Sequence, residues 1–124
     1  MLVEKAVSAL RKKGYTVATV KHTEGDWTLD QKGKDTWRHW KAGADPVVFS
    51  SASETSIMMH APTTLEQVTN ILTREFNPDV IIIEGDKHGN YPKVAVGSIR
   101  SLKNTVMRNP ELDRLLRYIE RSVI

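Results

Sequence analysis

The chain has 124 residues, 40% of them hydrophobic and 27% charged, which is the composition of a soluble globular protein with a core of its own. It has no cysteine, which excludes disulfides and thiol chemistry, and no segment resembles a signal peptide or a membrane span, so we expect a cytoplasmic protein. The formal net charge is +3, with basic residues concentrated in 1–41 and 97–124, a distribution that favours polyanionic partners or simply solvated helix faces.

Helical and strand patterns alternate along the first half of the chain. Apolar residues recur at helical spacing over residues 2–13, and Gly14 provides a C-terminal stop. Residues 15–20 form a predicted strand that ends at Lys21 and His22, followed by a polar loop over 23–33. We then expect a short helix and two further strands, in this order: 34–42, 46–50 and 55–60.

The second half continues the alternation. Thr63 and Glu66 form a capping-box pattern that opens a helix with an apolar side made of Leu65, Val68, Leu72 and Phe76. Strands are predicted over 79–83 and 93–96. Asn109 and Pro110 start a closing helix whose inner face is Leu112, Leu115, Leu116 and Ile119. The pattern predicts one α/β domain over 1–124, with a mostly parallel, three-layer sheet.

The most informative stretch is Val80–Ile83, four β-branched residues that run directly into Glu84 and Gly85. An uninterrupted apolar run of this kind predicts a strand buried on both faces, as in parallel sheets. Ligands of such sheets bind outside the carboxyl ends of the strands, where Glu84 would lie. A carboxylate beside a glycine suits Mg²⁺ or its water shell next to a phosphate; an ordinary buried strand that ends in Glu is the alternative.

Six short segments follow one another along the chain: KKGYTVATVKH (12–22), Asp30, GKDTWRH (33–39), AGAD (42–45), IEGDK (83–87) and PKV (92–94). In this order and spacing they resemble the MobB family, the molybdopterin-guanine dinucleotide biosynthesis adaptor proteins. Each segment alone is weakly specific, whereas their ordered combination is more specific. The resemblance covers residues 2–97 well and the final helix loosely.

The resemblance implies a P-loop NTPase-like protein that binds GTP with Mg²⁺, hydrolyses it weakly and assists a molybdopterin guanylyltransferase. In that family the phosphate loop G-x-x-x-x-G-K-[ST] follows the first strand and supplies backbone N–H donors to the phosphates. Here Met1–Glu4 aligns just past that motif, so the Walker A loop and the first strand are absent from the sequence. We therefore expect that the gene product begins upstream, and that hydrolysis does not survive in the chain as given.

The expected site residues combine this resemblance with their places in the predicted elements. Glu84 is the expected catalytic acid, which would polarise a metal-bound water. Asp30 is the expected second contact, and both residues would meet Mg²⁺ through water. The expected nucleotide-binding residues are Lys21, His22, Lys34, Asp35, Arg38 and Gly85. Each has an ordinary structural alternative. His22 could be a strand-end histidine bonded to backbone, and Asp30 a turn-forming aspartate. Lys34 and Arg38 could be a surface pair at helical spacing.

Other features leave different functions open. Trp37 and Trp40 lie three residues apart, which is typical of helix packing but also suits stacking on a flat heterocycle, and the four histidines show no metal-ligand spacing. One alternative is a non-catalytic adaptor without a P-loop, a homodimer through an exposed sheet edge, that binds the guanylyltransferase or the molybdenum insertase. Another is a nucleic-acid-binding module that uses three basic residues without a recognition motif: Arg114, Arg117 and Arg121.

Overall fold

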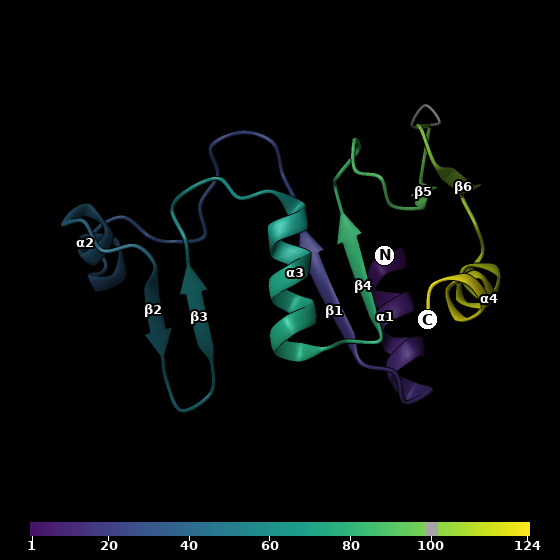
Figure 1. Cartoon of the computed structure of the whole chain (residues 1–124), viewed down its shortest axis with the longest axis horizontal. Helices are drawn as coiled ribbons and strands as arrows, with labels where there is room; N and C mark the ends of the chain where they lie inside the picture. Colours follow the sequence, from purple (N-terminus) through teal and green to yellow (C-terminus); the bar gives the residue numbers. More distant parts are fainter. Residues whose placement is uncertain (99–101) are drawn as a thin grey trace. The chain divides into compact units, whose positions relative to one another are not determined.

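The computed structural model describes residues 1–98 and 102–124, and the chain divides into two compact units (Figure 1). Unit 1 consists of Met1–Thr23 together with Leu65–Ile124, and unit 2 is Glu24–Thr64. Over the described ranges, no helix is both long enough and apolar enough to cross a membrane. Each unit has its own strands, and the predicted site residues are divided between the two.

The described residues of unit 1 form four strands in two parallel pairs. β1 (Val17–Lys21) pairs with β4 (Val80–Glu84), so that their arrows in Figure 1 point the same way, and β5 (Lys93–Ala95) pairs with β6 (Thr105–Arg108). Its helices are α1 (Leu2–Lys12), α3 (Leu65–Phe76) and α4 (Leu112–Ser122). The predicted α/β class with parallel pairing is confirmed. The strands nevertheless form separate two-stranded sheets, one of which contains β6, a strand that the sequence pattern did not indicate.

The core of unit 1 lies where α1 and α4 meet. Its buried residues come from both helices and from β4 and β6: Ala6, Leu10, Val80, Met107, Leu115, Leu116 and Ile119. The helical spacing of apolar residues predicted both helices and most of these contacts. α4 begins at Leu112 rather than at the Asn109–Pro110 step, because Asn109 has φ +44 and its amide group bonds both backbone groups of Gly97.

The prediction that the Val80–Ile83 strand is buried on both faces is wrong. Only Val80 is buried, and Ile81, Ile82 and Ile83 are half-buried. The reason is that β4 has a single strand partner within the described residues, and an apolar groove of about 770 Å³ lies beside it, lined also by β5, α1 and α4. The apolar side of α3 is likewise only partly covered, and Phe76 is exposed.

β1 begins two residues later than predicted. The two residues before it form side-chain hydrogen bonds, Tyr15 with Glu120 and Thr16 with Asp79. The Thr16 N–H and hydroxyl both donate to Asp79 Oδ2, at 2.8 and 3.1 Å, and the Asp79 N–H donates to Thr16 Oγ1 at 2.9 Å. This reciprocal pair joins the residues that precede β1 and β4. It therefore helps to set the register in which Val17 lies opposite Val80.

A polar cluster on the outside of unit 1 joins the end of α1 to α4. Glu120 accepts hydrogen bonds from the Lys13 ammonium group and, at 3.1 Å, from the Tyr15 hydroxyl. These bonds favour the charged carboxylate, chiefly the bond from Lys13, so they lower the pKa of Glu120 below its usual value. The hydrogen bond of each donor to Glu120 likewise raises the pKa of Lys13 and the pKa of Tyr15.

Glu120→Gln is expected to lower the melting temperature of unit 1 at neutral pH and to have little effect in acid. A carboxyl group with a lowered pKa in the folded state stabilises above its unfolded-state pKa, and this contribution disappears as the pH falls through the folded-state value. Thermal unfolding of both proteins between about pH 3 and 7 checks this. A difference in melting temperature that stayed constant over that range would show that Glu120 does not act through its charge.

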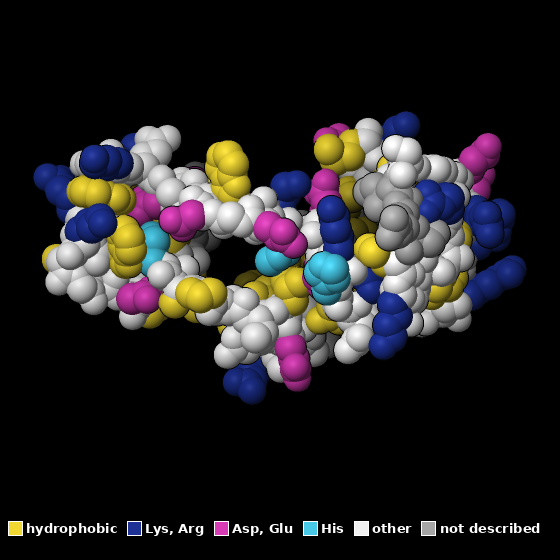
Figure 2. All heavy atoms as spheres, turned by 90° about the horizontal axis from the view of Figure 1, so that it is seen from above, with side chains coloured by type: hydrophobic (Ala, Val, Ile, Leu, Met, Phe, Trp, Pro, Cys, Tyr) yellow, Lys and Arg dark blue, Asp and Glu magenta, His cyan; other side chains and the backbone are white. Residues whose placement is uncertain are grey.

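Unit 2 contains the short helix α2 (Asp35–Lys41) and an antiparallel hairpin of β2 (Val47–Ser50) and β3 (Thr55–Met58). α2 contacts β2, and Val47 is buried. The opposite face of the hairpin is uncovered, since the cross-strand partners Val48 and Ile57 are 54% and 67% exposed. Hydrophobic side chains accordingly appear on the surface of unit 2, at the left of Figure 2. The predicted helix and both predicted strands are present with slightly shorter bounds.

Candidate functional site

The first candidate cluster lies at the carboxyl ends of β1 and β4, and we name it the strand-end cluster: Lys21, His22, Glu84 and Gly85. Parallel pairing places Lys21 directly opposite Glu84, and the Lys21 Nζ lies 3.6 Å from Glu84 Oε1. The His22 N–H donates to the Glu84 carbonyl oxygen at 2.8 Å. The structure thus brings together two adjacent pairs of predicted site residues, and more than sixty residues separate one pair from the other in sequence.

Gly85 shapes the strand-end cluster through its backbone. Its φ of +96° lies in the region that favours glycine, and an added Cβ atom would lie closer than 3.0 Å to the carbonyl oxygen of His22. The two chain segments therefore approach each other more closely here than any side chain would allow. This close approach brings the backbone after β1 against the backbone after β4. Glu84 is the residue directly before Gly85.

The Glu84 side chain is accessible as well as positioned. It is 38% exposed, and the paired Lys21 is 71% exposed, so both charges face solvent and their attraction is screened. No group of three or more His, Asp or Glu residues that could hold a metal ion occurs in residues 1–98 and 102–124. A single accessible carboxylate fits Mg²⁺, which keeps several of its waters and is commonly bound through one or two carboxylates plus substrate phosphates.

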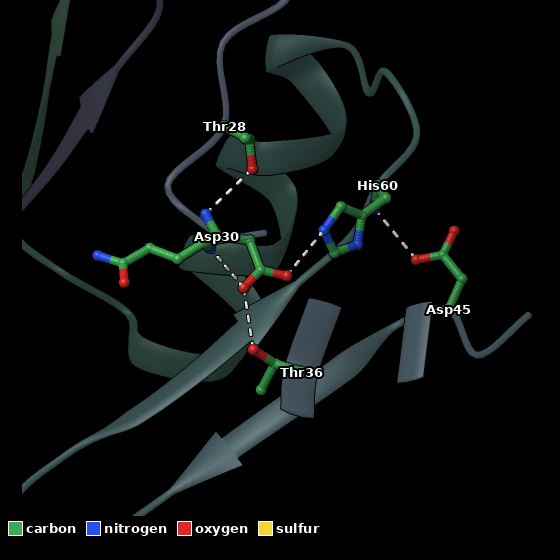
Figure 3. Close-up of polar contacts among 6 residues, drawn as sticks. Thr28, Asp30, Thr36, Asp45 and His60 are labelled. Carbon is green, nitrogen blue, oxygen red and sulfur yellow. Dashed lines mark hydrogen bonds and ion pairs between the residues drawn. The ribbon is translucent and has the colours of Figure 1, made fainter. Parts of the chain in front are cut away.

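The second cluster lies in unit 2 and is centred on Asp30, so we name it the Asp30 cluster: Thr28, Asp30, Gln31, Thr36 and His60 (Figure 3). Asp30 Oδ1 accepts hydrogen bonds from the Thr36 hydroxyl at 2.9 Å and from the Gln31 N–H at 3.0 Å. The Asp30 N–H donates to Thr28 Oγ1 at 3.0 Å. The carboxylate thereby ties the loop before α2 to the first turn of that helix.

His60 completes the Asp30 cluster from the end of β3. Its ring Nε2 lies 3.5 Å from Asp30 Oδ2, and the ring stacks on Trp40 with centroids 4.4 Å apart. Its backbone N–H donates to Asp45 Oδ1 at 3.1 Å. Sequence reasoning did not single out His60 as a site residue. No spacing signal could have found it, because thirty residues separate it from Asp30 and only the folding of unit 2 brings the two together.

The other predicted nucleotide-binding residues lie around α2. Lys34 is the residue before the helix, with extended backbone, and its carbonyl oxygen accepts the Arg38 N–H at 3.0 Å. The Arg38 side chain forms an exposed ion pair with Asp35, one turn earlier in the helix. The ammonium group of Lys41 lies over the rings of Trp37 and Trp40, so the faces of these indoles contact residues of the chain itself, which favours packing.

The chain is similar to known proteins both in sequence and in fold. The family model described as molybdopterin guanine dinucleotide synthesis protein B matches residues 1–117. Molybdopterin-guanine dinucleotide biosynthesis adapter proteins of Haemophilus influenzae and Escherichia coli are 28% and 30% identical over 75% and 77% of this chain, which covers 53% and 56% of their lengths. The crystal structure of Bacillus subtilis MobB has the same fold, with a TM-score of 0.68 at 24% identity over 86% of this chain and 67% of that one.

Proposed function

Because the chain belongs to the family of molybdopterin guanine dinucleotide synthesis protein B, we propose that it is an accessory protein of molybdenum cofactor biosynthesis that binds GTP with Mg²⁺. The chain spans about half the length of the curated adapter proteins it matches. The observation that carries the proposal is the strand-end cluster, because it combines an accessible carboxylate, a lysine and a close backbone turn at the ligand-binding edge of parallel strands.

Three of the four members of the strand-end cluster have a direct role in this proposal, and His22 joins them through its backbone N–H bond to the Glu84 carbonyl. Glu84 would accept hydrogen bonds from the waters of a bound Mg²⁺, and Lys21 would place its positive charge near a phosphate. Gly85 leaves the backbone open to close approach. A bound Mg²⁺ would neutralise phosphate charge. Asp30 as a second Mg²⁺ contact, and Lys34, Asp35 and Arg38 as nucleotide contacts, are proposed from the family resemblance alone.

A second candidate function is a non-catalytic adaptor that binds a molybdopterin guanylyltransferase or a molybdenum insertase. Two observations favour it: the relatives carry the name adapter protein, and several large apolar side chains are uncovered, among them Val48, Ile57 and Phe76. Such surface commonly marks a protein interface. We propose that part of it is covered in a homodimer, and that the protein works in the cytoplasm.

Calorimetric titration of GTP with Mg²⁺ tests the proposed function. The proteins are the 124-residue chain, its Glu84→Gln variant, and a version with a phosphate-loop segment added before Met1. We expect binding that is at least about tenfold weaker in Glu84→Gln, since the variant keeps shape but loses the negative charge. Binding that Glu84→Gln leaves unchanged would remove Glu84 from the site. No heat from any of the three proteins would favour the adaptor instead.

A further inference from the structure

The loop that joins β4 to β5 begins directly after the strand-end cluster. It runs from Asp86 to Pro92, leaves the arrowhead of β4 and belongs to no helix or strand (Figure 1). Both of its ends line the apolar groove together with Glu84 and Lys93. Ligands of parallel sheets bind outside the carboxyl ends of the strands, so a loop that follows such a strand flanks the ligand. The position of this loop therefore matters for any ligand of Glu84.

The loop is packed tightly within itself. The His88 N–H donates to Asp86 Oδ1 at 3.3 Å. A Cβ atom added to Gly89 would lie 2.2 Å from Asp86 Oδ2 and 2.9 Å from Tyr91 Cδ2, so this glycine lies against both side chains. These contacts fold the loop onto itself, but they do not attach it to the rest of unit 1.

The side chain of Lys93 provides that attachment. Lys93 is the first residue of β5, and its ammonium group donates to the carbonyl oxygen of Gly89 and, at 3.0 Å, to that of Lys103. Its backbone N–H also donates to the carbonyl oxygen of Asn104, at 2.8 Å. One residue thus ties the middle of the loop after β4 to the segment that precedes β6.

The partners of Lys93 are those of a residue that joins chain segments. An ammonium group has three donors and no acceptor, and a charged donor forms stronger hydrogen bonds to carbonyl oxygens than a neutral donor does. Within the part of the chain that the structure describes, Lys93 forms no ion pair with a carboxylate. Its half-buried side chain instead bonds the backbone of two separate segments.

We infer that Lys93 is a positioning residue of the nucleotide site, because its ammonium group holds the loop after β4 in place beside Glu84. The inference rests on the proposed function, in which GTP with Mg²⁺ binds at the strand-end cluster. A loop that is already ordered before the ligand arrives loses little conformational freedom on binding, and the affinity is higher for that reason. Lys93 acts through the loop and not by contact with the nucleotide.

Backbone nitrogen-15 relaxation of the nucleotide-free protein tests whether Lys93 orders the loop. In the natural chain we expect order parameters of about 0.85 for residues 87–91, the value of a rigid backbone. Lys93→Met keeps an unbranched side chain but removes the donors, so its order parameters should fall below about 0.6, whereas Lys93→Arg should keep the natural values. Lys103→Met is the matched control, since it removes a positive charge without changing the carbonyl group that Lys93 binds.

Calorimetric titration of GTP with Mg²⁺ into the same four proteins tests whether the ordered loop matters for binding. We expect Lys93→Met to bind about tenfold more weakly than the natural chain does. Lys93→Arg and Lys103→Met should stay within about threefold of the natural affinity. A merely structural role of Lys93 would lower the melting temperature without a selective loss of order in residues 87–91.

Order parameters below about 0.6 in the natural chain would overturn the inference, and this measurement does not require Lys93→Met to fold. Unchanged order parameters in Lys93→Met would also overturn it, as would a loosened loop with unchanged GTP affinity. If the natural chain bound no GTP, the proposed function would be rejected. The relaxation measurements contain no nucleotide, so they would still decide whether Lys93 holds the loop.

Discussion

A Gly85→Ala variant should lose about 2–4 kcal/mol of the free energy of unfolding of unit 1, because two penalties combine. A φ of +96° is unfavourable for any residue with a Cβ atom, and the added atom would overlap the carbonyl oxygen of His22. To relieve the overlap, the ends of β1 and β4 must separate. That movement would weaken the bond between the His22 N–H and the Glu84 carbonyl.

Gly14→Ala is the matched control, because Gly14 has nearly the same φ, +94°, with nothing within 4 Å of an added Cβ atom. It should show the conformational penalty alone, about 1–2 kcal/mol. Urea unfolding of both variants, followed by circular dichroism, measures the difference. Equal losses of stability in the two variants would mean that the close approach of Gly85 to His22 does not constrain the strand ends.

Leu10→Ala should cost about 3–5 kcal/mol of stability, since it leaves a cavity in the centre of the unit 1 core. Leu10 is 0% exposed and belongs to the cluster in which α1 and α4 meet. The substitution removes buried apolar atoms, and the surrounding helices can only partly collapse into the space. Denaturant unfolding of unit 1 checks the expected loss, with an unchanged far-ultraviolet spectrum in the absence of denaturant.

Leu29→Ala provides the comparison for the core variant. Leu29 is 101% exposed, so the same chemical change there should alter stability by less than about 0.5 kcal/mol. If Leu10→Ala cost as little as Leu29→Ala, the core would not lie between α1 and α4. A large loss in Leu29→Ala would instead show that its side chain is covered in solution, which the proposed dimer would explain.

Much of unit 1 was predictable because its signals are local. The apolar spacing in α1 and α4 repeats at the period of a helix, and a helix with one apolar stripe must bury it, so Leu10 and Leu116 were identifiable as core residues. The burial of β4 was not predictable in the same way. How many of its faces and edges are covered depends on neighbouring strands, and an isoleucine run has the same sequence whether or not they are present.

The two clusters of the candidate site also differ in how far the sequence predicted them. Lys21 and Glu84 were predicted together because each follows a strand, and the carboxyl ends of parallel strands meet at one edge. The contacts of Asp30 with Thr36 and His60 have no such rule behind them. They arise because a loop, a helix and a hairpin converge, and only the folded chain shows that His60 faces the carboxylate.

The sequence by itself determined every helix and every strand except β6, the α/β class and the membership of the family, because periodicity and short motifs are properties of neighbouring residues. The tertiary structure decided the strand pairing, the incomplete cover of β4 and the partners of Asp30. These depend on contacts between residues far apart in the chain. Their free energies come from burial and from hydrogen bonds that exist only once the chain has folded.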